Sequence, residues 1–81
     1  DNYLIEWCCD RSQEVISSSG KPLTSGQYIY FDTYGARPVN CWYVKGNTTD
    51  PTTIEGTLNG VTYMDCNDCQ NQLGQFCKRR A

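Results

Sequence analysis

Six cysteines in a chain of only 81 residues are the strongest constraint on how this protein folds. A chain of this length buries only about 60% of the surface that its unfolded form exposes, so its hydrophobic core alone gives marginal stability. An even number of cysteines in a short chain is typical of a disulfide framework formed in an oxidising compartment. We therefore expect three disulfides, or two and a free pair, among the six residues, which are Cys8, Cys9, Cys41, Cys66, Cys69 and Cys77.

The pairing of these cysteines is open from the sequence, because six cysteines can be joined in many ways. Cys8 and Cys9 are adjacent, and neighbouring residues of an extended strand point to opposite faces, so each is expected to have a different partner. Cys66 and Cys69 are also expected to bond elsewhere rather than to each other. A bridge from the first strand to the last segment would close a long loop, which is worth roughly 3–4 kcal/mol in the chain-entropy model.

The spacing Cys66-x-x-Cys69 permits two other interpretations. A redox pair is disfavoured, because the carboxylates of Asp65 and Asp68 raise the pKa of a neighbouring thiol, the wrong direction for a reactive thiolate. A structural zinc site is the stronger alternative, because one Cys-x-x-Cys supplies half of the usual ligand spacing. The alternative zinc set is Cys9, Cys41, Cys66 and Cys69, with Cys8 able to replace Cys9.

Short apolar and aromatic runs alternate with turn residues along the chain, which indicates β-strands. The predicted strands cover residues 2–7, 14–17, 27–34, 39–45, 52–58 and 61–65. The last two are predicted to form a hairpin, because Asn59-Gly60 suits a type I′ turn. A short helical turn is expected within 65–76, capped by Asp65 or Asn67. The pattern predicts an all-β fold, a small disulfide-stapled sandwich or barrel of about five or six short strands.

The aromatic strand over 27–34 presents two different faces. The predicted core contains Leu4, Ile29, Phe31, Trp42 and Val44. Tyrosines opposite this core either cover the second side of a thin sandwich or form an interface for subunits or glycans, because tyrosine has an apolar body and a polar tip. The candidate interface residues are Tyr28, Tyr30, Tyr34 and Tyr43.

The charge is unevenly distributed along the chain. The formal net charge is −2, but residues 1–77 carry four basic against nine acidic side chains, a net of −5, because Lys78, Arg79 and Arg80 supply the other basic residues. We expect one domain over 1–77, followed by a basic tail over 78–81. The acidic body disfavours nucleic-acid binding. No apolar run approaches about 18 residues, so no membrane span is expected.

The chain has no histidine, which removes the commonest general base and the triads that depend on it. No serine with a neighbouring base and no pair of carboxylates stands out, so we expect neither an enzyme nor a cofactor. Asn47-Thr48-Thr49 is an N-glycosylation sequon, predicted to lie in a loop over 46–51.

Three motifs together resemble a small cysteine-rich module of structural, fibre and adhesin-like proteins in tailed phages and other viruses. They are the opening "YLIEWCC", the central "CWYV" and the closing "YMDCNDC", which together span residues 3–69. The positions that match the module's pattern are Tyr3, Cys8 or Cys9, Cys41, Trp42, Val44, Asp65, Cys66 and Cys69.

The resemblance implies a non-catalytic structural or adhesive module, a repeating subunit or domain of an extracellular or virion-surface fibre. Its expected partners are copies of itself, other structural subunits and possible surface glycans, reached through edge strands or the tyrosine face. The alternative, which composition alone permits, is a free secreted cysteine-rich effector such as a small toxin or inhibitor.

Overall fold

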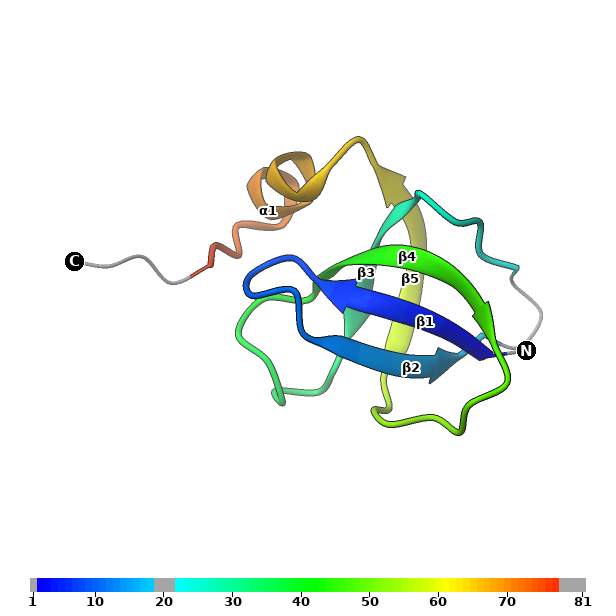
Figure 1. Cartoon of the computed structure of the whole chain (residues 1–81). Coiled ribbons are helices and arrows are strands. Elements are labelled where there is room, and N and C mark those ends of the chain that lie inside the picture. Colours follow the sequence, from blue (N-terminus) through cyan, green and yellow to red (C-terminus); the bar gives the residue numbers. More distant parts are fainter. Residues whose placement is uncertain (1, 19–21, 78–81) are drawn as a thin grey trace.

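A computed structural model describes residues 2–18 and 22–77, and this part contains five antiparallel strands in one sheet followed by one helix. The strand order across the sheet is β2-β1-β4-β3-β5 (Figure 1). The predicted small disulfide-stapled β-fold with a short helix near the C-terminus is therefore confirmed. The predicted tail over 78–81 lies outside the described residues. The elements are β1 (Asn2–Trp7), β2 (Gln13–Ser17), β3 (Tyr28–Asp32), β4 (Cys41–Thr48), β5 (Thr57–Tyr63) and α1 (Cys66–Leu73).

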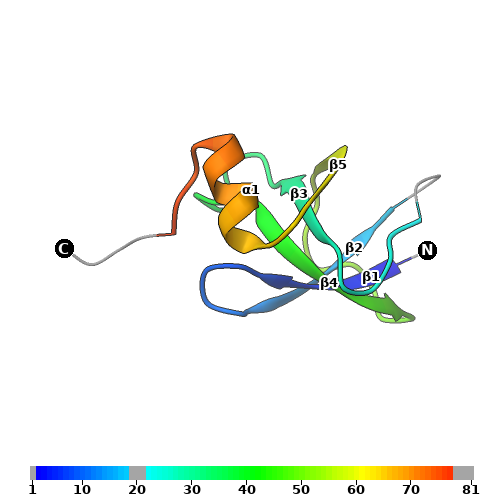
Figure 2. The same ribbon diagram turned by 90° about the horizontal axis from the view of Figure 1, so that it is seen from above.

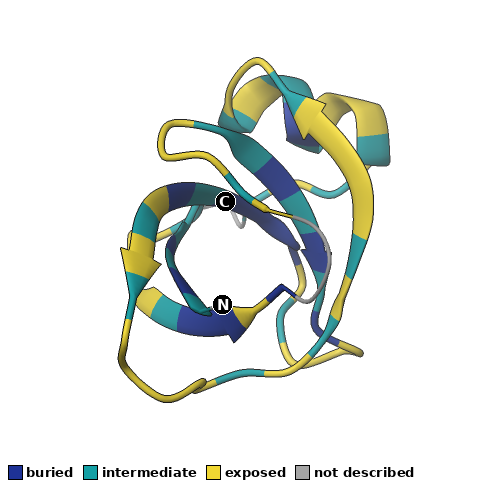
Figure 3. Cartoon of the chain, turned by 90° about the vertical axis from the view of Figure 1, so that its right-hand side faces the viewer, coloured by how far each residue is buried: buried dark blue, intermediate teal, exposed yellow. Residues whose placement is uncertain are grey.

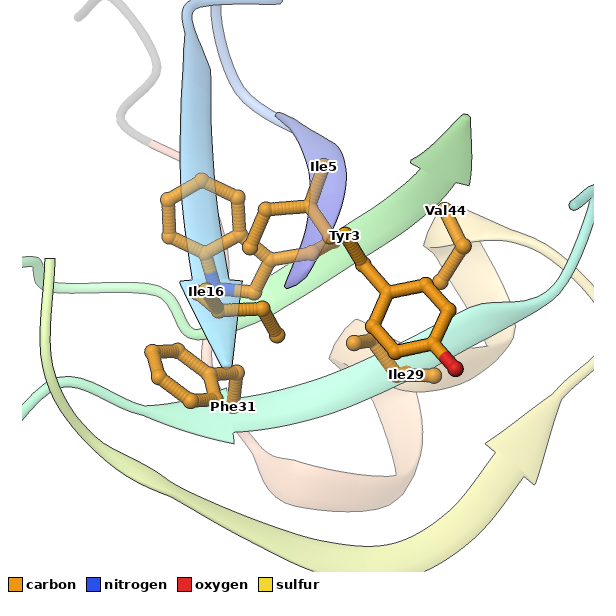
Figure 4. Packing of buried hydrophobic residues seen from close by; sticks show 7 residues of the cluster. Tyr3, Ile5, Ile16, Ile29, Phe31 and Val44 are labelled. Atoms are coloured by element: carbon orange, nitrogen blue, oxygen red, sulfur yellow. The ribbon is translucent and has the colours of Figure 1, made fainter. Parts of the chain in front are cut away.

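The sheet curls so that one face turns inward (Figure 3). Alternation along the strands places apolar side chains on this inner face, and Figure 4 shows them pointing toward one another from β1, β2, β3 and β4. The predicted core residues Ile29, Phe31, Trp42 and Val44 are buried. Leu4 was a wrong prediction, because Tyr3 and Ile5 occupy the inner face of β1 and Leu4 is only half-buried. The core cluster is Tyr3, Ile5, Ile16, Ile29, Phe31, Trp42 and Val44.

Trp42 is the largest fully buried side chain. Its indole N–H has no hydrogen-bond partner among the described residues, which costs about 1–3 kcal/mol. Arg37 lies over this ring and over the ring of Trp7, with its guanidinium carbon 5.2 and 4.6 Å from the two ring centroids. The guanidinium also pairs with Glu14 at 2.5 Å and donates to Ser12 Oγ at 3.1 Å. Arg37, which no sequence pattern singled out, thus ties the tryptophans to β2 through cation–π and ionic contacts.

The outer edge of β2 is covered by the segment that follows β4. The Thr53 N–H donates to the Val15 carbonyl at 2.9 Å, and the Val15 N–H donates to Thr53 Oγ1 at 2.8 Å. A strand was predicted over 52–58, but only its end, from Thr57, belongs to β5, because Thr53 bonds to Val15 of β2 before the chain reaches β3. Gly56 ends this segment in close contact with Asp32 and Phe31 of β3.

The predicted hairpin at Asn59-Gly60 is also wrong, because both residues lie inside the continuous strand β5. The registers of β3 and β5 shift between Ile29 and Phe31, which places extra β5 residues in a bulge. Gly60 has φ 82°, a backbone conformation that suits glycine, and Asn59 Oδ1 accepts from the Val61 N–H at 2.9 Å. The turn-forming dipeptide therefore bends a strand rather than reversing the chain.

Helix α1 follows β5 and packs against β3, β4 and β5 at one end of the sheet (Figure 2). Asp65 is its N-cap, as predicted, and accepts from the Asp68 N–H at 2.7 Å. The Asp68 carboxylate in turn accepts from the Met64 N–H, and this bond, followed by one from Gln72, lowers the pKa of Asp68. Gly74, with φ 67°, ends the helix in a left-handed C-cap.

Three disulfides fasten this helical end to the sheet. The pairs are Cys8–Cys66, Cys9–Cys77 and Cys41–Cys69. As expected, Cys8 and Cys9 have different partners, and so do Cys66 and Cys69. The four cysteines of the alternative zinc set are thus divided among three disulfides and offer no thiolates, so the structure does not assemble that site. Cys41 and Cys69 are fully buried with Val39 in a second cluster under α1.

We predict that removing Cys41–Cys69 destabilises the protein more than removing Cys9–Cys77, although the residues joined are 28 rather than 68 positions apart. While Cys8–Cys66 remains intact, the path from Cys9 to Cys77 through that bridge spans about a dozen residues, so their bridge closes a shorter loop than Cys41–Cys69 does. Cys41–Cys69 closes a loop worth about 3–4 kcal/mol, and its side chains also fill the second cluster.

The two double variants, Cys41→Ala with Cys69→Ala and Cys9→Ala with Cys77→Ala, are compared by denaturant unfolding without reductant. A larger loss of unfolding free energy for the Cys9/Cys77 variant contradicts the assignment.

We also predict that Gly56→Ala destabilises the protein by about 1–3 kcal/mol. A Cβ at this position would lie 2.0 Å from the Asp32 carbonyl oxygen and 2.8 Å from the Phe31 ring, so segment 52–56 must move away from β3. Amide exchange should then accelerate at Thr53, whose N–H pairs with β2.

Asn71→Ala serves as the control, because Asn71 is exposed on helix α1 and no hydrogen bond of its side chain joins it to the described residues. It should leave exchange at Thr53 unchanged, and equal acceleration in both variants would show that Gly56 has no special packing role.

Candidate functional site

A row of tyrosines crosses the outer face of the sheet, opposite the core. In this row Glu6 of β1 is the Cα partner of Tyr43, Tyr43 is the partner of Tyr28, and Tyr28 is the partner of Tyr63. The row therefore runs over β1, β4, β3 and β5 in their order in the sheet. We call Tyr28, Tyr43 and Tyr63 the tyrosine row. Strand alternation explains the place of Tyr28 and Tyr43, because they neighbour core residues along their strands and so point to the opposite face. Tyr63 joins them through its pairing with Tyr28.

Tyr28 and Tyr43 form the centre of the row. Their ring centroids are 5.0 Å apart, and the rings are inclined by 52°, an arrangement that aromatic pairs favour. Both side chains are half-buried. Within the described residues no hydrogen bond reaches either phenol, whereas the Tyr63 hydroxyl accepts from Asn59 Nδ2 at 3.0 Å. Two phenol groups are thus available at the sheet surface.

The predicted interface set does not stay together. Tyr28 and Tyr43 meet, but Tyr30 lies nearer the helical end, where its hydroxyl accepts from Gln75 Nε2 at 3.4 Å. Tyr34 lies in the turn after β3, with φ 57° and 70% exposure, and its hydroxyl is hydrogen-bonded to Thr57. The prediction failed for Tyr34 because β3 ends at Asp32, whose carboxylate accepts from the Tyr34 N–H. This bond closes a turn.

Tyr63 was missed by the sequence interpretation. The expected hairpin at Asn59-Gly60 placed Tyr63 in a separate strand. A continuous β5 pairs it directly with Tyr28. The available signal for placing Tyr63 on the outer face was its alternation with the exposed Thr62. No sequence rule, however, distinguishes an Asn-Gly pair that forms a bulge from one that forms a turn.

A groove with a volume of about 440 Å³ lies beside the centre of the tyrosine row. We call it the tyrosine groove, and its wall is mixed, with two phenols, three charged side chains, an indole and a disulfide. Such a combination can hold and orient a polar ligand, because rings supply contact area and charged groups supply hydrogen bonds. The lining residues are Glu6, Trp7, Cys8, Arg11, Tyr28, Tyr43, Lys45 and Cys66.

A second recess lies between β5 and the segment that leads into β3. Its volume is about 360 Å³, and most of its wall is apolar. Ile29 of the core lines it together with Leu23, Leu58 and Val61. We call it the apolar cleft. It lies at the end of the sheet where the last strand, β5, pairs only with β3.

The sequon asparagine Asn47 is exposed, but it does not lie in the predicted loop. Strand β4 continues to Thr48, so Asn47 lies within the strand and is the Cα partner of Tyr3. The strand is longer than predicted because Gly46, with φ 150°, accommodates a register shift between β1 and β4. Glycosylation at Asn47 stays a prediction.

Within residues 2–18 and 22–77, no group of three or more His, Cys, Asp or Glu side chains is arranged to hold a metal ion. In the same residues no helix is long and apolar enough to cross a membrane. The features described above are the tyrosine groove, the apolar cleft and the unpaired edge of β5.

Comparison with known proteins gives no relative: no family model matches the chain, and no curated protein and no solved structure is significantly similar to it.

Proposed function

We propose that this protein is a non-catalytic structural or adhesive module that acts outside the cell or on a virion surface by joining copies of itself through strand β5. Three disulfides formed from all six cysteines support the extracellular part, because such bonds persist in oxidising environments. The virion part is supported by the resemblance of the cysteine and tryptophan motifs to the viral module.

The observation that carries the proposal is the difference between the two edges of the sheet. At the β2 edge, Val15 in the middle of the strand exchanges hydrogen bonds with Thr53. For β5, no backbone hydrogen bond from the described residues reaches the edge that faces away from β3. Free N–H and C=O groups on an edge strand pair readily with a strand from another chain.

The composition of β5 favours such pairing. The strand TLNGVTY contains no charged residue, although residues 1–77 as a whole carry a net charge of −5. Proteins that keep a strand edge from pairing often place lysine or other charges on it. Two copies that approach through β5 thus bring together no like charges from that strand.

The apolar cleft supplies the second part of the contact. Strand addition gains affinity from main-chain hydrogen bonds and selectivity from pockets that receive side chains next to the edge. Val61 is 49% exposed at the rim of the cleft, and Leu58 and Ile29 line it. The occupant we propose is the β5 strand of a second copy, paired antiparallel, with apolar side chains of each copy covering the cleft of the other.

We predict that the wild-type chain self-associates between about 10 µM and 1 mM and that Val61→Lys weakens this association by about tenfold or more. The substitution would add two like charges to the paired strands, next to the apolar cleft that each copy covers. Sedimentation velocity across this concentration range measures the association. Amide exchange should slow at β5 on association, because its free N–H groups become bonded.

Gln13→Lys is the matched control, because it adds the same charge at an exposed position on β2, at the far end of the sheet. Its association should equal that of the wild type. A wild-type chain that stays monomeric over the whole range contradicts the proposal and favours a free secreted effector.

A further inference from the structure

We infer that the tyrosine groove is a carbohydrate site that receives a neutral pyranose residue of a glycan. This site lies on the outer face of the sheet, away from the apolar cleft, and does not depend on the pairing proposed for β5. A pyranose ring presents a C–H face and a rim of hydroxyl groups. Recognising it takes an aromatic surface beside several hydrogen-bond donors and acceptors, and the tyrosine groove combines these features.

The aromatic surface comes from Tyr28 and Tyr43. The inclined rings form a platform and a side wall rather than a flat stack, because their planes differ by 52°. Pairing of β3 with β4 fixes their spacing, since the two residues are direct Cα partners. Rigid aromatic side chains supply contact area at a small cost in conformational entropy.

The polar rim comes from three charged side chains. Glu6 follows Tyr43 in the row, and its Oε2 is 4.0 Å from Lys45 Nζ. This distance is too long for a hydrogen bond, so the carboxylate can accept and the ammonium can donate to a ligand. Arg11 supplies further donors, since no hydrogen bond or ion pair engages its side chain in the described residues. Sugar hydroxyls, which both donate and accept, match this mixture.

The groove is held in shape before a ligand arrives. The disulfide Cys8–Cys66 forms part of its wall and joins the end of β1 to the start of α1. Arg11 has φ 67°, and its N–H donates to the Trp7 carbonyl at 3.0 Å, which sets the β1–β2 turn that carries it. Preformed geometry reduces the entropy that binding would cost.

The Glu6 carboxylate makes a neutral sugar the ligand that we propose, although Arg11 and Lys45 give the groove wall one more positive than negative charge. A sulfated or phosphorylated group in the groove would meet Arg11 and Lys45, but it would also meet the Glu6 carboxylate directly. An apolar ligand is disfavoured, because it would bury these three charged groups without partners.

The test is titration of the isotope-labelled full chain with methyl glycosides of glucose, galactose, mannose and N-acetylglucosamine, followed by amide NMR. We expect at least one of them to shift the signals of Glu6, Arg11, Tyr28 and Tyr43 saturably. Tyr43→Ala should weaken that binding by about tenfold or more, because the ring contact is lost. Tyr34→Ala removes an exposed tyrosine outside the groove and should bind like the wild type.

Further variants keep the test decisive if Tyr43→Ala unfolds. Tyr43→Phe retains the ring that contacts the sugar. The double variant Glu6→Gln with Lys45→Ala removes the charges that β1 and β4 contribute to the polar rim. We expect Tyr43→Phe to bind the sugar more tightly than this double variant. Val61→Lys should bind sugar normally, which separates this site from the β5 contact. The inference is overturned if no neutral glycoside shifts these signals, if only sulfated sugars do, or if the groove variants bind like the wild type.

Discussion

The buried disulfide Cys41–Cys69 is the bond on which the rest of the structure depends. Cys41 begins β4, which lies between β1 and β3, and Cys69 is the one residue of α1 that is fully buried. The bond therefore joins the middle of the sheet to the only helix in the described residues. It also occupies the centre of the second cluster, with Val39. A chain with so small a core needs this covalent link to hold its last segment in place.

The three disulfides and helix α1 also divide the outer face of the sheet into a covered part and an open part. Its helical end is covered by α1 and by the segment that carries Gln75, which reaches Tyr30. The remainder is left to Tyr28 and Tyr43. Because Cys8–Cys66 is both a staple of the fold and part of the groove wall, the residues that stabilise the protein also shape its candidate binding site. Rigid support of this kind keeps a small site in one geometry.

The two edges of the sheet limit how copies can assemble. With β2 covered by Thr53 and β5 open, antiparallel pairing of β5 with β5 uses the same surface twice and closes a dimer. A fibre built from such dimers needs a further contact outside the β5 edge. A sugar bound in the tyrosine groove would leave the β5 edge free. The inferred sugar site and the proposed β5 pairing therefore use separate surfaces.

The sequence by itself determined the disulfide-stapled β-fold, the Asp65 cap and most of the core, because cysteine number, alternation and capping are local properties of the chain. It left the disulfide pairing open, and it misplaced Leu4, Tyr34 and the Asn59-Gly60 bend. Those depended on tertiary contacts: which face of β1 turns inward, where Asp32 ends β3, and how β5 pairs with β3. Only the register of the strands decided that Tyr28 lies beside Tyr43 and that Tyr43 lies beside Glu6, because register joins residues that are far apart in the chain.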